Sequence, residues 1–386
     1  MTIQETDVAE YLARVARAAP AIREAAEQVE AGQELPADLL EILHAEKFFR
    51  LALPKVYGGE EVDPPAYFQI VSALAEHDAS TAWCIGQANG CAIISAFLDA
   101  EVADEIWTND PAAVIAWGPG SAEVEVRDDG YIVTGTWRFA SGSHHATWLG
   151  GRTTIELPDG STIYRAMLFP VDKAERIDIW NVMGMRGTGS DGYSVKDLFV
   201  PKNYAIDRNY IPEERRYNEP LFFIPSGVMH SIGFAGVALG VARSMLDEFI
   251  EVATEKKPYR MRNTLAENQL VQSDVATCQA KINAARAYML NETREVWADV
   301  IDKGELTMPS HMRLRLATTY SIHEAKAAVD TIYDAVGATA IFKGNRMERR
   351  FRDMHTLTQQ SQGRKTHFQA VGAFLLGLDP ELPPPM

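Results

Sequence analysis

The sequence WNVMGMRGTGSDGYSVKDLFVP spans residues 180–201 and joins a glycine-rich turn to a strand-like run. Gly187 and Gly189 mark a turn shortly before the run Tyr193–Val200, which is rich in β-branched and aromatic residues. Glycines at such a turn could let backbone amides approach a phosphate or a ring edge, but an ordinary tight turn before a strand has the same sequence. The segment therefore predicts a turn followed by a strand.

The β-rich region extends outward from this segment, from about Val114 to Val200. It contains the alternating runs VEVRDDGYIVTGTWRF and IELPDGSTIYRAMLFP, each with an Asp-Gly pair, Asp129-Gly130 and Asp159-Gly160. Asp-Gly between two strand-like runs is a signal for a β-hairpin. We expect a central β-domain over residues 113–218.

Helical patterns flank this β-domain on both sides. Apolar residues recur at three- and four-residue steps from Val8 to Val29, and Asp7 is placed to cap that helix. Downstream, four helices of a bundle are expected over residues 227–256, 265–301, 311–336 and 346–378. The predicted domains are an N-terminal helical domain (1–112), the central β-domain (113–218) and a C-terminal helical bundle (219–386).

The composition is that of a globular protein and narrows the classes of partner. The 386 residues include 37 Lys+Arg and 53 Asp+Glu, so the formal net charge is −16. This balance argues against nucleic acid or an anionic membrane surface as the main partner. Three cysteines without a C-x-x-C pair exclude a disulfide scaffold. Because no secretory signal and no apolar run of about 18 residues stands out, we expect a cytoplasmic protein without a membrane span.

A second segment, GTWRFASGSHHATW (135–148), ends a strand-like run at Ser-Gly. A hydroxyl at such a strand end, beside Trp137 and Phe139, could hydrogen-bond a planar heterocycle, and Ser141 is the candidate. An ordinary strand followed by a polar turn is the alternative interpretation. His144-His145 does not indicate a metal site, because adjacent side chains on a strand point to opposite faces and no further ligands stand at a recognisable spacing.

A third segment, RRFRDMHTLTQQSQGRKTHFQ (349–369), carries a basic cluster and two histidines. A histidine that titrates near neutral pH can act as a general base or a hydrogen-bond donor, which makes His355 a candidate. A solvated helix face, with the arginines paired to acids, explains the same residues, and it is the preferred interpretation for His367. Ser-His-Asp catalysis is not indicated, because no G-x-S-x-G element follows a strand.

Taken together, these segments resemble the acyl-CoA dehydrogenase superfamily along essentially the whole chain. RFASG stands where that family has a Trp/Phe-Ile-Thr/Ser element, and GMRGTGSDGYSVKDLFVP is similar to its central strand pair. ENQLVQSDVATCQAKINAARAYML resembles a helix of its third domain, with Gln269 at a recurring Gln. The resemblance implies a mainly α fold with a central β-barrel or sandwich and a C-terminal four-helix bundle. It also implies a flavin at the domain junction and a homotetramer.

The chain departs from the true dehydrogenases at three places. Their catalytic Glu follows an Arg-Asp pair by nine residues, and counting from Arg352-Asp353 reaches Ser361-Gln362. Serine is a poor base for abstracting an α-proton. The Gly-Gly-x-Gly loop keeps only Gly337. The Arg-x-x-Phe-Gly element that holds the flavin pyrophosphate falls on PYRMR, where Arg260 or Arg262 would have to compensate.

The chain is more similar to the oxygenase branch of this fold, the two-component (group D) flavin-dependent monooxygenases. The similar phrases are TWRFASGSHHATWLGG, MRGTGSDGYSV, FRDMHT and the ending FLLGLDP. Members of that branch take reduced FMN or FAD from a separate flavin reductase, react with molecular oxygen and form a C4a-hydroperoxyflavin. The resemblance therefore implies hydroxylation of a hydrophobic aromatic or heteroaromatic substrate.

The resemblance also implies roles for particular residues. Ser141 would hydrogen-bond N5 and O4 of the flavin and protect the hydroperoxide, and His355 would orient or deprotonate the substrate or protonate the peroxide. Many relatives have a second histidine where this chain has Gln360, which cannot titrate. The remaining expected contacts are with the flavin for Trp117, Phe139, Arg260, Arg262 and Gly337, and with the substrate for Trp83, Asn89 and Gln360.

Two other functions remain open from the sequence. An acyl-CoA dehydrogenase-like flavin oxidoreductase would need a relocated Asp or Glu near the flavin N5. A non-catalytic flavin-binding relative would need neither Ser141 nor His355. Trp83 and Trp137 also fit an ordinary hydrophobic core.

Overall fold

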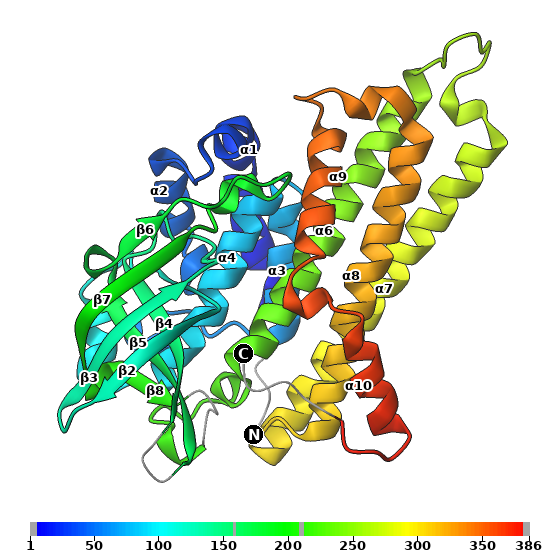
Figure 1. Cartoon of the computed structure of the whole chain (residues 1–386). Helices are drawn as coiled ribbons and strands as arrows, with labels where there is room; N and C mark the ends of the chain where they lie inside the picture. Colours follow the sequence, from blue (N-terminus) through cyan, green and yellow to red (C-terminus); the bar gives the residue numbers. More distant parts are fainter. Residues whose placement is uncertain (1–5, 157–159, 208–211, 381–386) are drawn as a thin grey trace.

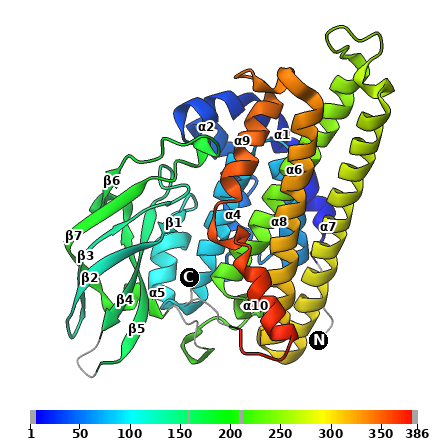
Figure 2. The same cartoon turned by 45° about the vertical axis from the view of Figure 1, so that its right-hand side comes forward.

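The computed structural model describes residues 6–156, 160–207 and 212–380. The strands of this part of the chain lie between Ile115 and Asp207, and helices precede and follow them. Figure 1 shows the β-domain standing beside the long C-terminal helices, and Figure 2 shows the same arrangement after a turn about the vertical axis. The predicted fold class, mainly helical with a central β-domain, is confirmed.

The N-terminal helices follow the apolar pattern of the sequence. In the first helix the side chains of Tyr11, Val15, Ile22 and Val29 are buried on one face, and the Asp7 carboxylate caps it by accepting the Ala9 amide N–H at 3.1 Å. The cap and the stripe are therefore as expected. The helices are α1 (Val8–Gly32), α2 (Ala37–Ala45), α3 (Pro64–Ala75), α4 (Ala79–Ala92) and α5 (Ala100–Ala103).

The β-domain is a pair of four-stranded sheets with the orders β1-β4-β5-β8 and β2-β3-β7-β6. The β1–β4 pair is parallel, and the β2–β3 and β4–β5 pairs are antiparallel, as the two predicted hairpins require. Asp159 of the second turn lies outside the described residues. The strands are β1 (Ile115–Gly118), β2 (Gly120–Val126), β3 (Gly130–Trp137), β4 (Trp148–Glu156), β5 (Thr162–Pro170), β6 (Glu175–Ile177), β7 (Gly192–Pro201) and β8 (Ala205–Asp207).

The C-terminal helices match three of the four expected ones. The prediction of a continuous helix over 346–378 is wrong, because the chain breaks at the short 3-10 helix η12 (Ser361–Gly363). The Gln360 side chain accepts the Gln362 amide N–H at 2.9 Å and so replaces a helical hydrogen bond. The helices are α6 (Ser226–Glu255), α7 (Gln269–Lys303), α8 (Met308–Val336), α9 (Arg346–Leu357) and α10 (Thr366–Leu375).

The helices before and after the β-domain share one hydrophobic core, and the β-domain has a second one. Helices α3 and α4 both pack against α6. Gly240 makes this close approach possible, since a Cβ atom there would lie 2.2 Å from the Ser72 carbonyl oxygen on α3. Among the described helices, α6 is long and apolar enough to cross a membrane. Its burial accounts for that composition, because 83% of its most apolar window lies inside the protein.

Candidate active site

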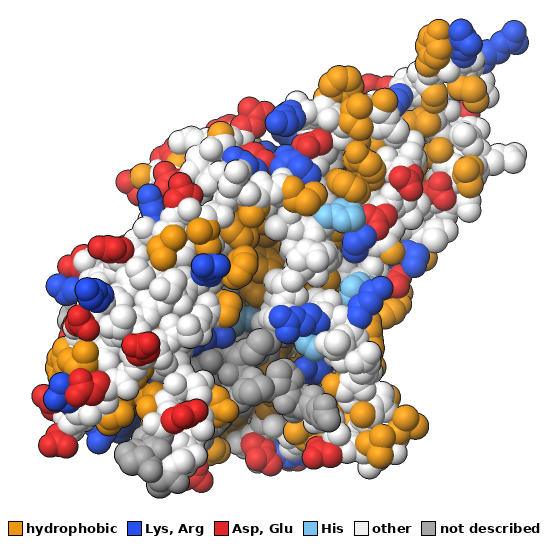
Figure 3. Space-filling view, viewed as in Figure 1, with side chains coloured by type: hydrophobic (Ala, Val, Ile, Leu, Met, Phe, Trp, Pro, Cys, Tyr) orange, Lys and Arg blue, Asp and Glu red, His pale blue; other side chains and the backbone are white. Residues whose placement is uncertain are grey.

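A cavity of about 570 Å³ lies where the β-domain meets α4, α6 and the turn after α9. Figure 3 shows hydrophobic side chains in a hollow between the β-domain and the long helices. Three of the seven tryptophans of the chain line this cavity, together with two phenylalanines. These aromatic residues are Trp83, Trp117, Trp180, Phe139 and Phe234.

The aromatic walls present flat surfaces. Trp83 of α4 and Phe234 of α6 stack with their ring centroids 3.6 Å apart and their planes 2° from parallel. The indole N–H of Trp117 is buried without a hydrogen-bond partner among the described residues, and the Arg152 guanidinium lies over its ring at 5.3 Å. A planar ligand fits these surfaces and could satisfy the Trp117 N–H.

Phe139 owes its position to an unusual backbone conformation. It has a φ of +60°, in the left-handed region that costs a non-glycine residue about 1–2 kcal/mol. Its side chain is 59% exposed and meets Trp180 edge-on at 6.2 Å, on the cavity wall. The strand end therefore turns sharply and points an aromatic ring toward the cavity.

Ser141 begins a chain of hydroxyl groups in the polar part of the wall. Its Oγ accepts the Trp83 indole N–H at 3.0 Å and lies 2.7 Å from the Ser190 Oγ. The Ser190 Oγ lies 2.7 Å from the Thr188 Oγ1, which donates to the Met185 carbonyl at 2.8 Å. Ser141 and Ser190 both line the cavity and are nearly buried, so Ser141, the hydroxyl candidate of the sequence, lies in a hydrogen-bonded polar part of its wall.

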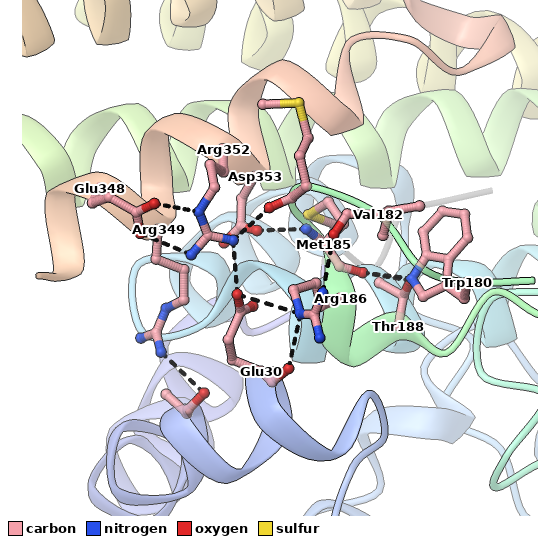
Figure 4. A network of polar contacts seen from close by, with 12 residues as sticks. Glu30, Trp180, Val182, Met185, Arg186, Thr188, Glu348, Arg349, Arg352 and Asp353 are labelled. Carbon is pink, nitrogen blue, oxygen red and sulfur yellow. Dashed lines mark hydrogen bonds and ion pairs between the residues drawn. The ribbon is translucent and has the colours of Figure 1, made fainter. Parts of the chain in front are cut away.

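The turn that carries these hydroxyls is held against α9, as Figure 4 shows. The Asp353 carboxylate accepts the Met185 amide N–H at 2.5 Å, and the Trp180 indole N–H donates to the Met185 carbonyl at 3.0 Å. Burial raises the pKa of Asp353 to about 7. Asp353 and Trp180 thus fix the Met185 peptide from both sides.

Arg352 ties the same turn to two helices. Its guanidinium lies 2.7 Å from the Glu30 carboxylate of α1 and 2.6 Å from the Glu348 carboxylate of α9, and it also donates to the Met183 carbonyl (Figure 4). Paired arginines on a helix face are what the alternative interpretation of this segment predicted. Gly187 completes the contact with α1, because a Cβ atom there would lie 2.0 Å from a Val29 methyl carbon.

His355, the predicted catalytic histidine, is not among the residues that line the cavity. Its Nε2 lies 2.8 Å from the Asp330 carboxylate of α8, and its ring packs against Phe351 at 4.3 Å between centroids. The α9 helix therefore turns this side chain toward α8. His367 also lies elsewhere, with its Nδ1 3.1 Å from the Thr319 hydroxyl, and burial lowers its pKa to about 4.

His230, which the sequence alone did not single out, lines the cavity from α6 and is 3% exposed. Its Nε2 lies 3.1 Å from the Gln87 carbonyl oxygen, and its ring meets Trp117 edge-on at 6.4 Å. Gly90 leaves room for the ring, since a Cβ atom there would lie 2.2 Å from the His230 Cδ2. The one sequence signal for a role of His230 is that it stands alone in the apolar run of a core helix. That signal is ambiguous without the contacts with Gly90 and Gln87.

The residues predicted to contact substrate divide into two groups. Gln360 and Trp83 line the cavity, and the Gln360 side-chain N–H₂ is buried without a partner among the described residues. Asn89 does not line it. Its amide donates to the Phe48 carbonyl at 2.7 Å and accepts the Ala52 amide N–H at 2.8 Å, which ties α4 to the preceding loop.

Three of the residues predicted to contact the flavin lie at the far end of the helical bundle. Arg260 and Arg262 stand between α6 and α7, and Gly337 follows α8. Lys256 joins these regions by donating to the Thr339 hydroxyl at 2.6 Å. None of the three is among the described residues that line the cavity of the same chain.

Comparisons with known proteins agree with this architecture. Residues 6–107 match the family model for the acyl-CoA dehydrogenase N-terminal domain, and residues 232–363 match that for the acyl-CoA dehydrogenase C-terminal domain. The chain is 28% identical to an indole-3-acetate monooxygenase of Acinetobacter baumannii over 345 residues, which cover 89% of this chain and 88% of that protein. It is also 28% identical to the oxygenase subunit HsaA of a flavin-dependent monooxygenase of Rhodococcus jostii, with 87% and 90% covered.

A solved structure supports the same likeness in three dimensions. The crystal structure of the HsaA monooxygenase from Mycobacterium tuberculosis superposes with a TM-score of 0.88 at 26% identity. The superposition covers 98% of this chain and 99% of that one.

Proposed function

The chain belongs to the acyl-CoA dehydrogenase superfamily and is a flavin-dependent monooxygenase, and we propose that it works as the oxygenase component of a two-component system. A separate reductase would supply the reduced flavin, FMN or FAD, and molecular oxygen would be the second substrate. The observation that carries this proposal is Ser141, held at the edge of an aromatic cavity by Trp83 and Ser190.

The residues of the cavity fit a reduced flavin. A reduced isoalloxazine carries an N–H at N5, and Ser141 offers a hydroxyl oxygen that can accept it. Phe139, Trp117 and Trp180 offer aromatic surfaces for the ring system. When bound, the reduced flavin supplies the electrons that activate oxygen, in our proposal through a C4a-hydroperoxyflavin. The apolar wall around Trp83 and Phe234 excludes water from the reacting centre.

The proposed substrate is a hydrophobic aromatic or heteroaromatic compound. The stacked Trp83–Phe234 pair offers it a flat surface. We assign the orienting or proton-transfer role at the substrate to His230 rather than His355, because His230 is the one of the two that lines the cavity. Gln360 can donate its unpartnered amide N–H to a polar group of the substrate.

The cavity does not favour an acyl-CoA dehydrogenase reaction. No Asp or Glu is found among the described residues that line it. A relocated carboxylate base, which such a reaction would need, is therefore not supported by this part of the chain.

The test is to mix the protein anaerobically with FMNH2 or FADH2, add oxygen and follow the absorbance. We expect a transient at the C4a-hydroperoxyflavin band that is absent without the protein, and the flavin that produces it is the preferred cofactor. Adding candidate aromatic compounds should then convert the transient into hydroxylated product. Featureless reoxidation with both flavins, with and without those compounds, would contradict the proposal.

A further inference from the structure

The protons of the hydroxyl chain can be assigned one by one from its far end. The Thr188 hydroxyl has one proton, and the geometry directs it to the Met185 carbonyl oxygen at 2.8 Å. Toward Ser190, at 2.7 Å, the Thr188 oxygen can therefore only accept. The Ser190 proton is consequently used in its bond to Thr188.

The same reasoning fixes the proton of Ser141. Because Ser190 has already used its proton, the 2.7 Å bond between Ser141 and Ser190 must be donated by Ser141. Ser141 in turn accepts the Trp83 indole N–H, which is a donor only. The hydrogen bonds thus run in one direction, from Trp83 through Ser141, Ser190 and Thr188 to the Met185 carbonyl.

The surroundings keep this direction from reversing. The side chains of Ser190 and Thr188 are each 2% exposed, so water has little access to offer them other partners. The backbone of Met185, whose carbonyl ends the series of hydrogen bonds, is held by Asp353 at its N–H and by Trp180 at its carbonyl (Figure 4). Ser141 therefore has a lone pair left for the cavity, while its proton is already engaged with Ser190.

We propose that Ser190 and Thr188 are positioning residues that make Ser141 an acceptor only, and that this polarity lets the site distinguish reduced from oxidised flavin. N5 of reduced flavin carries a proton and can donate it to Ser141. N5 of oxidised flavin is itself an acceptor, so it would face the Ser141 lone pair without a proton between them. The inference rests on the proposed function, and it gives a reason for oxidised flavin to leave after turnover.

The test is Ser190→Ala, with dissociation constants measured for oxidised flavin in air and for reduced flavin under anaerobic conditions. Removing the Ser190 oxygen frees the Ser141 proton for N5 of oxidised flavin. We expect oxidised flavin to bind roughly 3- to 10-fold more tightly, the gain from about one neutral hydrogen bond, with reduced flavin nearly unaffected. A merely structural role would weaken the binding of both forms together.

Two further substitutions serve as a second probe and a control. Thr188→Val removes the hydroxyl that accepts the Ser190 proton, and it should shift the ratio of the two dissociation constants in the same direction. Thr188→Ser keeps that hydroxyl and should keep the original ratio. Ser143→Ala removes a nearby buried hydroxyl that donates to the Gly189 carbonyl at 3.0 Å and takes no part in the series of hydroxyl hydrogen bonds. It should leave the ratio of the two dissociation constants unchanged.

An unchanged ratio in both Ser190→Ala and Thr188→Val, or a parallel loss of both flavins, would overturn the inference. The proposed function fails differently, since the unaltered protein would then form no oxygenated flavin when reduced flavin and oxygen are mixed with it. The flavin titrations therefore test the inference, and the oxygen reaction of the unaltered protein tests the proposed function.

Discussion

At the scale of single residues, the chemistry of the cavity depends most on the Ser141 hydroxyl. Ser141→Ala removes the acceptor for N5–H and leaves the Trp83 indole N–H without its partner. We expect the oxygenated flavin to decay roughly tenfold faster, with more hydrogen peroxide released per turnover. Stopped-flow absorbance and a peroxide assay measure both effects, and Ser143→Ala is the matched control. Unchanged decay and coupling would remove Ser141 from the site.

The two histidines should respond differently to the same substitution. His230→Gln removes the imidazole from the cavity wall, and we expect product formation to fall while flavin binding is largely kept. His355→Gln breaks a partly exposed pair with Asp330, so we expect product formation to persist and the free energy of unfolding to fall by about 0.5–1 kcal/mol. Product yield and urea unfolding report these effects. The reverse pattern would return the catalytic role to His355.

These two side chains also mark what the sequence could and could not predict about the site. Ser141 could be selected as a candidate because its strand end, its aromatic neighbours and its Ser-Gly break are all local in sequence, and the structure places it on the cavity wall. His230 was missed because its place in the cavity depends on Gly90 and Gln87, which lie more than one hundred residues earlier on α4. The direction of His355 could not be predicted, because a helical residue can face either neighbour, and in the structure its side chain lies against Asp330 of α8 and not on the cavity wall.

At the scale of elements, α9 controls the glycine-rich turn through Asp353, and this contact should depend on pH. Burial raises the pKa of this carboxyl to about 7 in the folded protein, against its ordinary value of 3.8. Between these values the folded state holds more protons than the unfolded one, so this group makes stability fall as pH rises.

Asp353→Asn should remove that fall, since the amide oxygen can still accept the Met185 N–H. We expect the stability of the variant relative to the original protein to rise between pH 5 and pH 8, by up to about 3 kcal/mol. Urea unfolding at both pH values measures the difference. A difference in unfolding free energy between the two proteins that stays constant with pH would contradict the raised pKa of Asp353.

The break after α9 is the element that the sequence did not reveal. From Arg346 onward the apolar residues keep a spacing that is compatible with one continuous helix. Residues Ser361–Gly363 stand out from this pattern only by a modestly lower helix propensity. The break depends on the Gln360 cap and on the close approach of Gly363 to Thr358, where a Cβ atom would lie 2.9 Å from the carbonyl oxygen. It matters because it turns the polar residues Gln359–Gln362 into the cavity wall.

At the scale of the whole molecule, the distance of Arg260 and Arg262 from their own cavity suggests a test of assembly. If these arginines hold the flavin phosphates, they must do so in a neighbouring copy, as the homotetramer implied by the family resemblance would allow. We would combine chains carrying His230→Gln with chains carrying Arg260→Ala and Arg262→Ala.

With sites shared between copies, about a quarter of the sites in an equal mixture would have both an intact cavity and intact arginines. Product formation should then recover in the mixture, although each variant alone is impaired. The control is each variant alone, treated in the same way and at the same total protein concentration as the mixture. No recovery in the mixture would place each site within a single chain.

The fold as a whole was more predictable than its packing. The order of helices, strands and helices follows from periodicity and turn residues that are local. The shared core of α3, α4 and α6 depends on contacts between residues far apart in sequence. Small residues of α6 meet the α3 backbone, although the whole β-domain lies between these helices in the sequence. The sequence therefore predicts three domains from local patterns, and among the described residues the two helical ones share a hydrophobic core.

The gathering of Trp83, Trp117 and Trp180 around one cavity gives the protein a built-in optical reporter. Most of the ultraviolet emission of such a chain comes from its indoles, and three of its seven indoles would meet an arriving flavin or aromatic guest at close range. Filling of the cavity should therefore quench the intrinsic fluorescence. Entry and release can then be followed in real time, without a label and without waiting for chemistry.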